Sequence, residues 1–163
     1  MPKNLKVGLA GEYLAASHLA RIFDDIFPAS SSSRFDFLCH KKNVNFKIQV
    51  KTSNSTFKKN NSDWVRWDIK KKISNKKEYR VYDGSEVDIF AFVFLKRDKV
   101  IFEPNYNLGK TYQKKVEYIK SIDTQESLKK SVNLIVEIKN KIIKSTDDKD
   151  RKSVDLALGS PAP

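Results

Sequence analysis

The apolar run Val87 to Leu95, whose one polar residue is Asp88, constrains the fold of this chain more than any other feature. Its Val, Ile and Phe residues are typical of a strand buried in the core of a sheet. Lys99 to Glu103 follows after the polar turn Lys96-Arg97-Asp98, and we expect the two segments to form a hairpin. A chain of 163 residues, 39% of them hydrophobic, is long enough to bury such a core in one domain.

The N-terminal third of the chain shows first helical and then strand periodicity. Apolar residues at spacings of mostly three and four predict a helix from Lys3 to Phe23. Two β-rich segments, Arg34 to His40 and Val44 to Ser53, flank the polar Lys41-Lys42-Asn43 and predict an antiparallel hairpin. The run of serines after Pro28 predicts a loop before this hairpin.

The rest of the chain predicts one further strand, a long helix and a tail. The strand is expected at Trp64 to Ile69. Asp123 and Glu126 have the spacing of a capping box, and the apolar stripe after them predicts a helix that ends near Ser145. Residues 146–163 are charged and end in GSPAP, so we expect a flexible tail. The sequence therefore predicts a single α/β (α+β) domain over residues 1–145 and a tail over 146–163.

Composition excludes several classes of protein and favours an anionic partner. The 32 Lys and Arg residues outnumber the 20 Asp and Glu residues, which gives a net charge of +12. Because the last 19 residues hold four acidic and three basic side chains, the first 144 carry +13. Double-stranded DNA binds such a surface through counterion release, although solubility or ribosome binding is an alternative use of the charge.

Neither a membrane span nor a secretion signal is apparent, and the single cysteine, Cys39, excludes an internal disulfide and a multi-cysteine zinc site. With only His18 and His40 beside it, a metal would have to be held mainly by oxygen. We therefore expect a cytoplasmic protein that is not associated with a membrane.

A polar patch is predicted on the first hairpin. Side chains alternate between the faces of a strand, so Gln49 and Lys51 lie on one face, opposite their apolar neighbours. Asp36 lies between Phe35 and Phe37 and falls on the side of Gln49 and Lys51 when the apolar faces are paired. Carboxylate and amide oxygens bind hard cations, and a lysine can activate water or stabilise charge on a phosphate. The patch predicts phosphodiester hydrolysis, whereas the alternative is a surface ion pair between Asp36 and Lys51.

These residues resemble a known family. The motifs are Gly11-Glu12-Tyr13-Leu14-Ala15-Ala16 on a helix, Arg34-Phe35-Asp36, and Ile48-Gln49-Val50-Lys51, and together they are similar to the PD-(D/E)XK nuclease superfamily. The resemblance covers about residues 8 to 53 and extends less specifically to the hairpin of residues 88–103. Gln49 replaces the usual second carboxylate, and Phe35 replaces a proline. The glutamine variant resembles the homing endonucleases encoded in bacterial group I introns, which implies a protein associated with the nucleoid of a bacterial or phage-infected cell.

The resemblance implies a fold, a chemistry and a role for each residue. The fold would be a restriction-endonuclease-like core, a mixed central β-sheet flanked by helices. Asp36 would be the principal metal ligand, Gln49 a neutral oxygen ligand, Lys51 the catalytic lysine and Glu12 an auxiliary acid, with Mg²⁺ as cofactor. The implied function is site-specific double-strand cleavage of DNA that leaves a 5′-phosphate and a 3′-hydroxyl. Two alternatives are a structure-selective nuclease such as a Holliday-junction resolvase, and a catalytically inert DNA-binding protein on the same fold.

Basic residues outside the patch are candidate DNA contacts. Arg66 shares a predicted strand face with Trp64 and Asp68 and could reach base edges, while Trp67 is expected on the opposite, core-facing side. We expect the segment 70–77, KKKISNKK, to be an exposed loop or helix end. The candidates for phosphate contacts are Arg34, Lys58, Lys59, Lys70, Lys71, Lys72, Lys76 and Lys77.

The expected task also predicts an oligomer. A homing site is longer than the DNA that one module of this size covers, and one catalytic patch cuts one strand. We therefore expect a homodimer or homotetramer, for which the apolar stripe of the helix from Thr124 to Lys144, Trp64 and Trp67 are candidate contacts.

Overall fold

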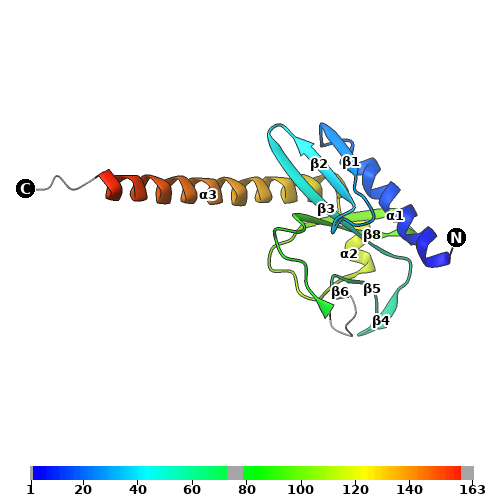
Figure 1. The fold of residues 1–163 in the computed structure, drawn as a ribbon. Coiled ribbons are helices and arrows are strands. Elements are labelled where there is room, and N and C mark those ends of the chain that lie inside the picture. The colour runs from blue at the N-terminus through cyan, green and yellow to red at the C-terminus, as the bar shows by residue number, and fades with distance from the viewer. Residues whose placement is uncertain (1, 73–78, 159–163) are drawn as a thin grey trace, which may run out of the picture.

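A five-stranded mixed sheet lies at the centre of the computed structural model, which describes residues 2–72 and 79–158 (Figure 1). Its strand order is β1-β2-β3-β8-β9, with β3 and β8 parallel and the other neighbours antiparallel. In chain order, the elements are α1 (Lys3–Leu19), β1 (Asp25–Pro28), β2 (Phe37–Lys41), β3 (Val44–Ser53), β4 (Phe57–Lys59), β5 (Ser62–Asp68), β6 (Lys71–Lys72), β7 (Tyr79–Arg80), β8 (Ile89–Phe94), a 3-10 turn (Leu95–Arg97), β9 (Lys99–Pro104), β10 (Thr111–Lys115), α2 (Val116–Ser121) and α3 (Thr124–Leu158). No helix in the described ranges is long and apolar enough to cross a membrane.

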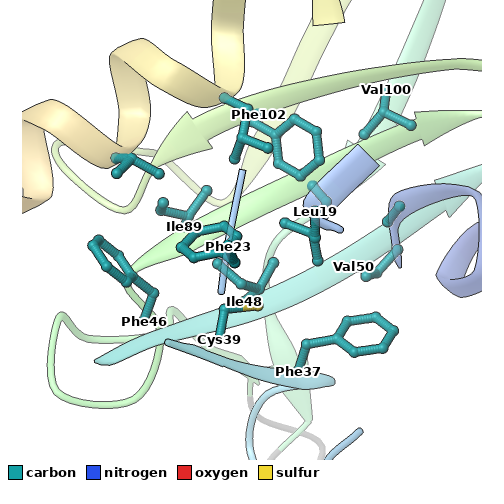
Figure 2. Packing of buried hydrophobic residues seen from close by; sticks show 14 of the residues in the cluster. Leu19, Phe23, Phe37, Cys39, Phe46, Ile48, Val50, Ile89, Val100 and Phe102 are labelled. Carbon is teal, nitrogen blue, oxygen red and sulfur yellow. The ribbon is translucent and has the colours of Figure 1, made fainter. Parts of the chain in front are cut away.

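Two hydrophobic cores lie on opposite faces of this sheet. On one face, α1 and the first half of α3 pack against apolar side chains of β2, β3, β8 and β9; Figure 2 shows this first core. On the other face, a three-stranded sheet of order β10-β5-β4 and helix α2 cover a second core. The predicted mixed sheet flanked by helices is therefore confirmed, with a small second sheet as an additional layer.

Strand β8 belongs to both cores, which explains its continuous apolar sequence. All six of its residues are buried. Its small and branched residues, Ile89, Ala91 and Val93, face the first core, and the phenylalanines at 90, 92 and 94 face the second. The rings of Phe90 and Phe92 stack with their centroids 5.7 Å apart. The predicted buried strand and its hairpin with β9 are confirmed.

Other predicted strands are confirmed with shifted ends. β2 and β3 form the expected hairpin, but β2 begins at Phe37 and not at Arg34. β5 matches the predicted strand at Trp64 to Ile69 and buries the expected face.

Both long helices end elsewhere than predicted. α1 ends at Leu19, after which a turn carries the buried Phe23 onto Phe46, with ring centroids 5.2 Å apart. The apolar pattern therefore continued past the helix because the turn also packs in the core.

α3 continues to Leu158, so the predicted end near Ser145 is wrong. No proline or glycine interrupts residues 124–158, and a helix can therefore continue past its apolar stripe. The start of α3 is as predicted from the capping-box spacing, because Asp123 Oδ1 accepts a hydrogen bond from the Glu126 backbone N–H at 3.0 Å.

Several short elements were not predicted. β1 occupies a segment expected to lead into a loop, and its Pro28 is tolerated because β1 is an edge strand. β4, β10 and α2 complete the layer over the second core. Lys71–Lys72 pair with Tyr79–Arg80 as a two-stranded ribbon, which corrects the predicted loop or helix end at these two residues. The rest of the predicted 70–77 segment, residues 73–77, lies outside the described residues.

Gly11 brings α1 close enough to β3 to place Glu12 beside the sheet. A Cβ atom at Gly11 would overlap Thr52 Oγ1 and would lie 2.8 and 2.9 Å from Thr52 Cγ2 and Cβ. At Gly8, one turn earlier on the same helix, a Cβ would meet nothing within 4 Å. The close approach of helix and strand therefore depends on the missing side chain at Gly11.

We expect Gly11→Ala and Gly8→Ala to change stability in opposite directions. Both substitutions improve helix propensity by up to about 1 kcal/mol, and Gly8→Ala should be stabilising. Gly11→Ala must also displace Thr52 or α1, at a cost of about 1–3 kcal/mol typical of overpacking, and should be destabilising overall. Urea unfolding of the two variants measures the difference. Thr52→Ala should recover part of the loss in the Gly11→Ala background, and equal stability of the two glycine variants would refute the close contact.

Candidate active site

The Asp36 carboxylate is fixed where the ladder between β2 and β3 ends. Asp36 lies one residue before β2, and its backbone N–H still donates to the carbonyl of Ile48 at 2.8 Å. Its Oδ2 accepts hydrogen bonds from the Val50 backbone N–H at 2.6 Å and from Gln49 Nε2 at 2.5 Å. The side chain therefore pairs with a backbone N–H of β3 that β2 no longer reaches.

Gln49 and Lys51 lie on the expected face of β3, opposite the buried Ile48 and Val50. Lys51 Nζ donates to the Tyr82 hydroxyl at 3.3 Å and lies 5.0 Å from the centroid of the Tyr82 ring. Phe35 departs from the prediction, because it packs against the second core while Phe37 belongs to the first. The two phenylalanines do not share a face, because the strand and its alternation begin only at Phe37.

Glu12 reaches the same site from α1. It lines a recess of about 260 Å³ with Lys51, Val50 and Thr52. The negative charge of Asp36 acts on Glu12, so the two carboxylates are close enough to interact. The structure thus brings Glu12, Asp36, Gln49 and Lys51 together, and we call these four residues the Asp36 patch.

The two carboxylates of the patch are held in an environment that disfavours their charge. Burial raises the pKa of Asp36, and the opposing effects of the Val50 N–H, Lys51 and Gln49 only partly offset it. Burial, and then the charge of Asp36, raise the pKa of Glu12. A bound cation would relieve both effects.

The donor set of the patch fits a hard divalent cation. Within residues 2–72 and 79–158, no group of three or more His, Cys, Asp or Glu side chains is arranged to hold a metal. The patch instead offers two carboxylates and the amide of Gln49, oxygen donors of the kind that Mg²⁺ takes together with water or phosphate oxygens. As placed, Gln49 turns its NH₂ group towards Asp36, so a half turn of the amide is needed to present its oxygen on that side.

A second cluster, not found by sequence reasoning, supports the patch. The carboxylate of Glu86, 7% exposed, accepts hydrogen bonds from Arg34 and from Arg80, whose Nη1 lies 2.6 Å from Oε2. Asn105 Nδ2 donates to the carbonyls of Asp83 and Val87, each at 3.0 Å. Glu86 thereby joins the segment that carries Tyr82 to the segment that carries Asp36. The only signal in the sequence was an acidic residue at the start of an apolar strand.

The candidate DNA contacts fall into four groups. Arg34 is ion-paired with the buried Glu86, so its guanidinium is already engaged. Four others lie on or beside the strands over the second core: Lys58 pairs with Asp63 at 3.1 Å, Lys59 lies over Trp64, Arg66 pairs with Asp68 at 3.0 Å, and Lys70 lies over Tyr79. Lys71 and Lys72 form β6, and Lys76 and Lys77 lie outside the described residues.

The remaining sequence candidates have structural partners. His18 Nδ1 lies 3.0 Å from Gln125 Nε2, and His40 Nδ1 lies 2.9 Å from Asn45 Oδ1. Burial raises the pKa of the Cys39 thiol to about 12, which makes it unreactive. Trp67 is buried, with Nε1 donating to the Val93 carbonyl at 2.8 Å, so it is not available for a subunit contact.

Comparisons with known proteins agree with this fold. A family model described as PD-(D/E)XK endonuclease matches residues 5–140. The chain is similar in structure to the bacterial homing endonuclease I-Ssp6803I, with a TM-score of 0.59 and 15% sequence identity over 85% of this chain and 97% of that chain. No curated protein matches the chain in sequence. The resemblance and the fold inferred from the sequence are confirmed, and at 15% identity the structural similarity concerns the fold alone.

We expect Asp36→Asn to stabilise the metal-free protein near pH 7. The pKa of Asp36 is raised in the folded state, so its contribution to stability falls as pH rises from the unfolded pKa, about 3.9, through the folded pKa. Asparagine retains an oxygen for the Val50 and Gln49 donors and removes the buried charge, which also relieves Glu12. Thermal unfolding should show a midpoint higher by a few degrees at pH 7, and the difference should shrink as pH falls through the folded pKa of Asp36 and be absent below the unfolded value of about 4.

Asp63→Asn is the matched control, because Asp63 is an exposed carboxylate with a surface ion pair, and its effect should be small at every pH. Added Mg²⁺ should raise the unfolding midpoint of the wild type more than that of Asp36→Asn. A destabilised Asp36→Asn protein at pH 7 would contradict the uncompensated burial of this carboxylate.

Proposed function

This chain belongs to the PD-(D/E)XK endonuclease family and is therefore a nuclease; from that premise we propose that it hydrolyses phosphodiester bonds of double-stranded DNA at the Asp36 patch, with Mg²⁺ as cofactor. The observation that carries the proposal is the Asp36 carboxylate, held by Val50 and Gln49 next to Lys51. A surface ion pair between Asp36 and Lys51 would need neither the Val50 backbone N–H as a donor nor a second carboxylate, that of Glu12, beside it.

Nucleases of this family generally use divalent metal ions, and the patch has suitable ligands. Asp36 and Glu12 would hold the cation with their carboxylates, and Gln49 with its amide oxygen after the half turn. When bound, the cation supplies Lewis-acid stabilisation of phosphate charge and lowers the pKa of a coordinated water. Because Gln49 is neutral, we expect weak Mg²⁺ binding without DNA.

Lys51 would act on the substrate directly. Its ammonium lies in the Asp36 patch and is held by the hydroxyl of Tyr82, which fixes the long side chain without neutralising it. In this position it can donate a hydrogen bond to a phosphate oxygen and stabilise the negative charge that develops during hydrolysis. Tyr82 is a positioning residue in this arrangement, and Glu86 and Asn105 hold the segment around it.

Site-specific cleavage of both strands is the finer part of the proposal. The similar solved structure is that of a homing endonuclease, and the net charge of +12 suits extended contacts with DNA. A double-strand cut needs two patches, so we propose a homodimer or homotetramer. Trp67 and the apolar residues in the first part of α3 are buried in the cores, whereas Ile143, further along α3, is 57% exposed. The C-terminal part of α3 projects from the body (Figure 1).

We expect Lys51→Ala to abolish cleavage while leaving DNA binding nearly unchanged. The ammonium acts in the chemical step, whereas phosphate affinity is distributed over many basic residues, so the rate should fall by at least about 100-fold and the affinity by less than about 3-fold. Nicking and linearisation of supercoiled plasmid libraries in Mg²⁺ measure the cleavage rate, and electrophoretic mobility shifts measure the DNA affinity.

Lys130→Ala is the matched control, because Lys130 is an exposed lysine on α3, paired with Glu126 and outside the patch, and its removal should leave the cleavage rate intact. Parallel loss of binding and cleavage in Lys51→Ala would contradict the catalytic role of Lys51. DNA binding by the wild type without any cut in linear, branched or supercoiled DNA would instead indicate an inert DNA-binding protein, and cuts confined to branched DNA would indicate a structure-selective nuclease.

The oligomeric state can be measured independently. We expect a particle of two or four times the 18.8 kDa monomer mass, free or bound to a duplex target. Size-exclusion chromatography with light scattering reports it. Ile143→Glu should weaken the assembly if the projecting part of α3 contributes, with the exposed Lys144→Glu as a control for the added charge. A monomer in both states would leave a nicking enzyme as the remaining interpretation.

A further inference from the structure

We propose that Arg66 and Asp68 together read one G·C base pair in the major groove, within about three base pairs of the cut phosphate. This inference rests on the proposed function and deepens it, because it names a base pair that the nuclease would recognise. The inference is argued from the placement of the two side chains, from the hydrogen bond and ion pair between them, and from the recess that they share with Lys51.

Strand β5 presents the two side chains on a rigid support. β5 is the middle strand of its sheet: β4 pairs with its first residues, 62–64, and β10 pairs with Arg66 and Asp68 through Gln113 and Thr111. Trp67, between the two residues, is 2% exposed and packs its ring against Phe92 and Tyr112 at 5.6 and 5.8 Å. Because Trp67 is fixed in the core, Arg66 and Asp68 must face outwards, where their side chains are 49% and 52% exposed.

The ion pair between them leaves the guanidinium oriented for a base. Asp68 Oδ1 accepts a hydrogen bond from Arg66 Nε at 3.1 Å and forms an ion pair with Nη2 at 3.0 Å. The free edge of the fork is then formed by Nη1 and the second N–H of Nη2, neither of which has a partner among the described residues. This edge matches the two acceptors of guanine, O6 and N7, which arginine binds in a bidentate manner.

Asp68 favours a base edge over a phosphate as the partner. A carboxylate next to a phosphate contact lowers affinity by repulsion, whereas in the major groove it can accept a hydrogen bond from cytosine N4. Its Oδ2 has no hydrogen-bond partner in the described parts of the chain. Arg66 and Asp68 thus offer donors to guanine and an acceptor to its paired cytosine, which is the pattern of one G·C pair.

The position of this base pair follows from a recess of about 460 Å³. Lys51, Arg66 and Asp68 all line it. A volume of this size spans about 10 Å, which corresponds to about three base-pair steps of 3.4 Å. DNA whose phosphate lies against Lys51 therefore brings a neighbouring base pair to Arg66.

Sequencing of the ends that the protein cuts from a randomised duplex library in Mg²⁺, aligned on the cut, tests the proposal. The wild type should prefer G·C at one position within about three base pairs of the cut. Arg66→Ala should reduce the preference at that position by about 5- to 100-fold and leave the other positions unchanged. Arg66→Lys retains the charge without the fork and should also lose much of the preference, and Asp68→Asn should weaken it.

Lys58→Ala on the neighbouring strand is the control and should lower affinity for all sequences alike, with no change in preference. Thermal unfolding checks that each variant is folded, which the exposure of both side chains favours. Unchanged base preference in Arg66→Ala, with uniformly weaker binding, would show a phosphate contact and overturn the inference while the proposed function stands. A wild type that cuts without any G·C preference near the cut would overturn it equally, and a wild type that cuts no DNA would overturn the proposed function itself.

Discussion

Strand β3 builds the first core with one face and the Asp36 patch with the other, and the rest of the structure depends on its register. Phe46, Ile48 and Val50 are buried, and Gln49 and Lys51 alternate with them. A slip of one residue against β2 or β8 would exchange the two sets. Such a slip is opposed because it would bury Gln49 and Lys51 in the first core and expose Ile48 and Val50. The patch is therefore fixed by the same packing that makes the fold stable.

Buried charges are treated differently inside and outside the patch. Glu86 and Asp88, each 7% exposed, have cationic partners: Arg34 and Arg80 for the first, and Lys139 at 2.9 Å for the second. Glu12 has neither an ion pair nor a hydrogen bond with any residue in the described ranges, and burial still raises the pKa of Asp36 despite its donors. The uncompensated charge is confined to the place where a cation and a phosphate would be needed, which is typical of functional sites.

The sequence predicted the strand faces, which depend on local alternation, but it did not predict features that depend on contacts between distant segments. Alternation along β3 and β5 placed Gln49, Lys51 and Arg66 on the correct faces, whereas it was wrong for Phe35, which precedes the strand. Glu86 could not be paired with Arg34 from the sequence, since 52 residues separate them. The packing role of Gly11 could not be predicted from the sequence either, because it depends on the approach of Thr52 from another element. The short strands β1, β4 and β10 have too few residues to show a period of their own. Roles of the patch residues remain predictions that mutagenesis has to test.

The residues proposed for catalysis and for base recognition lie on two different sheets, and strand β8 contacts both. The ring of Phe92 on β8 lies 5.6 Å from Trp67, which anchors the β5 segment of Arg66, and stacks on Tyr112 of β10 at 4.1 Å. In the same strand, Phe92 is the register partner of Lys51 on β3. The distance between Lys51 and Arg66 is therefore set by packing within the second core and not by a flexible loop. Exposed residues on β5 can thus change without disturbing the Asp36 patch, because the side chains that hold the two layers together point inwards.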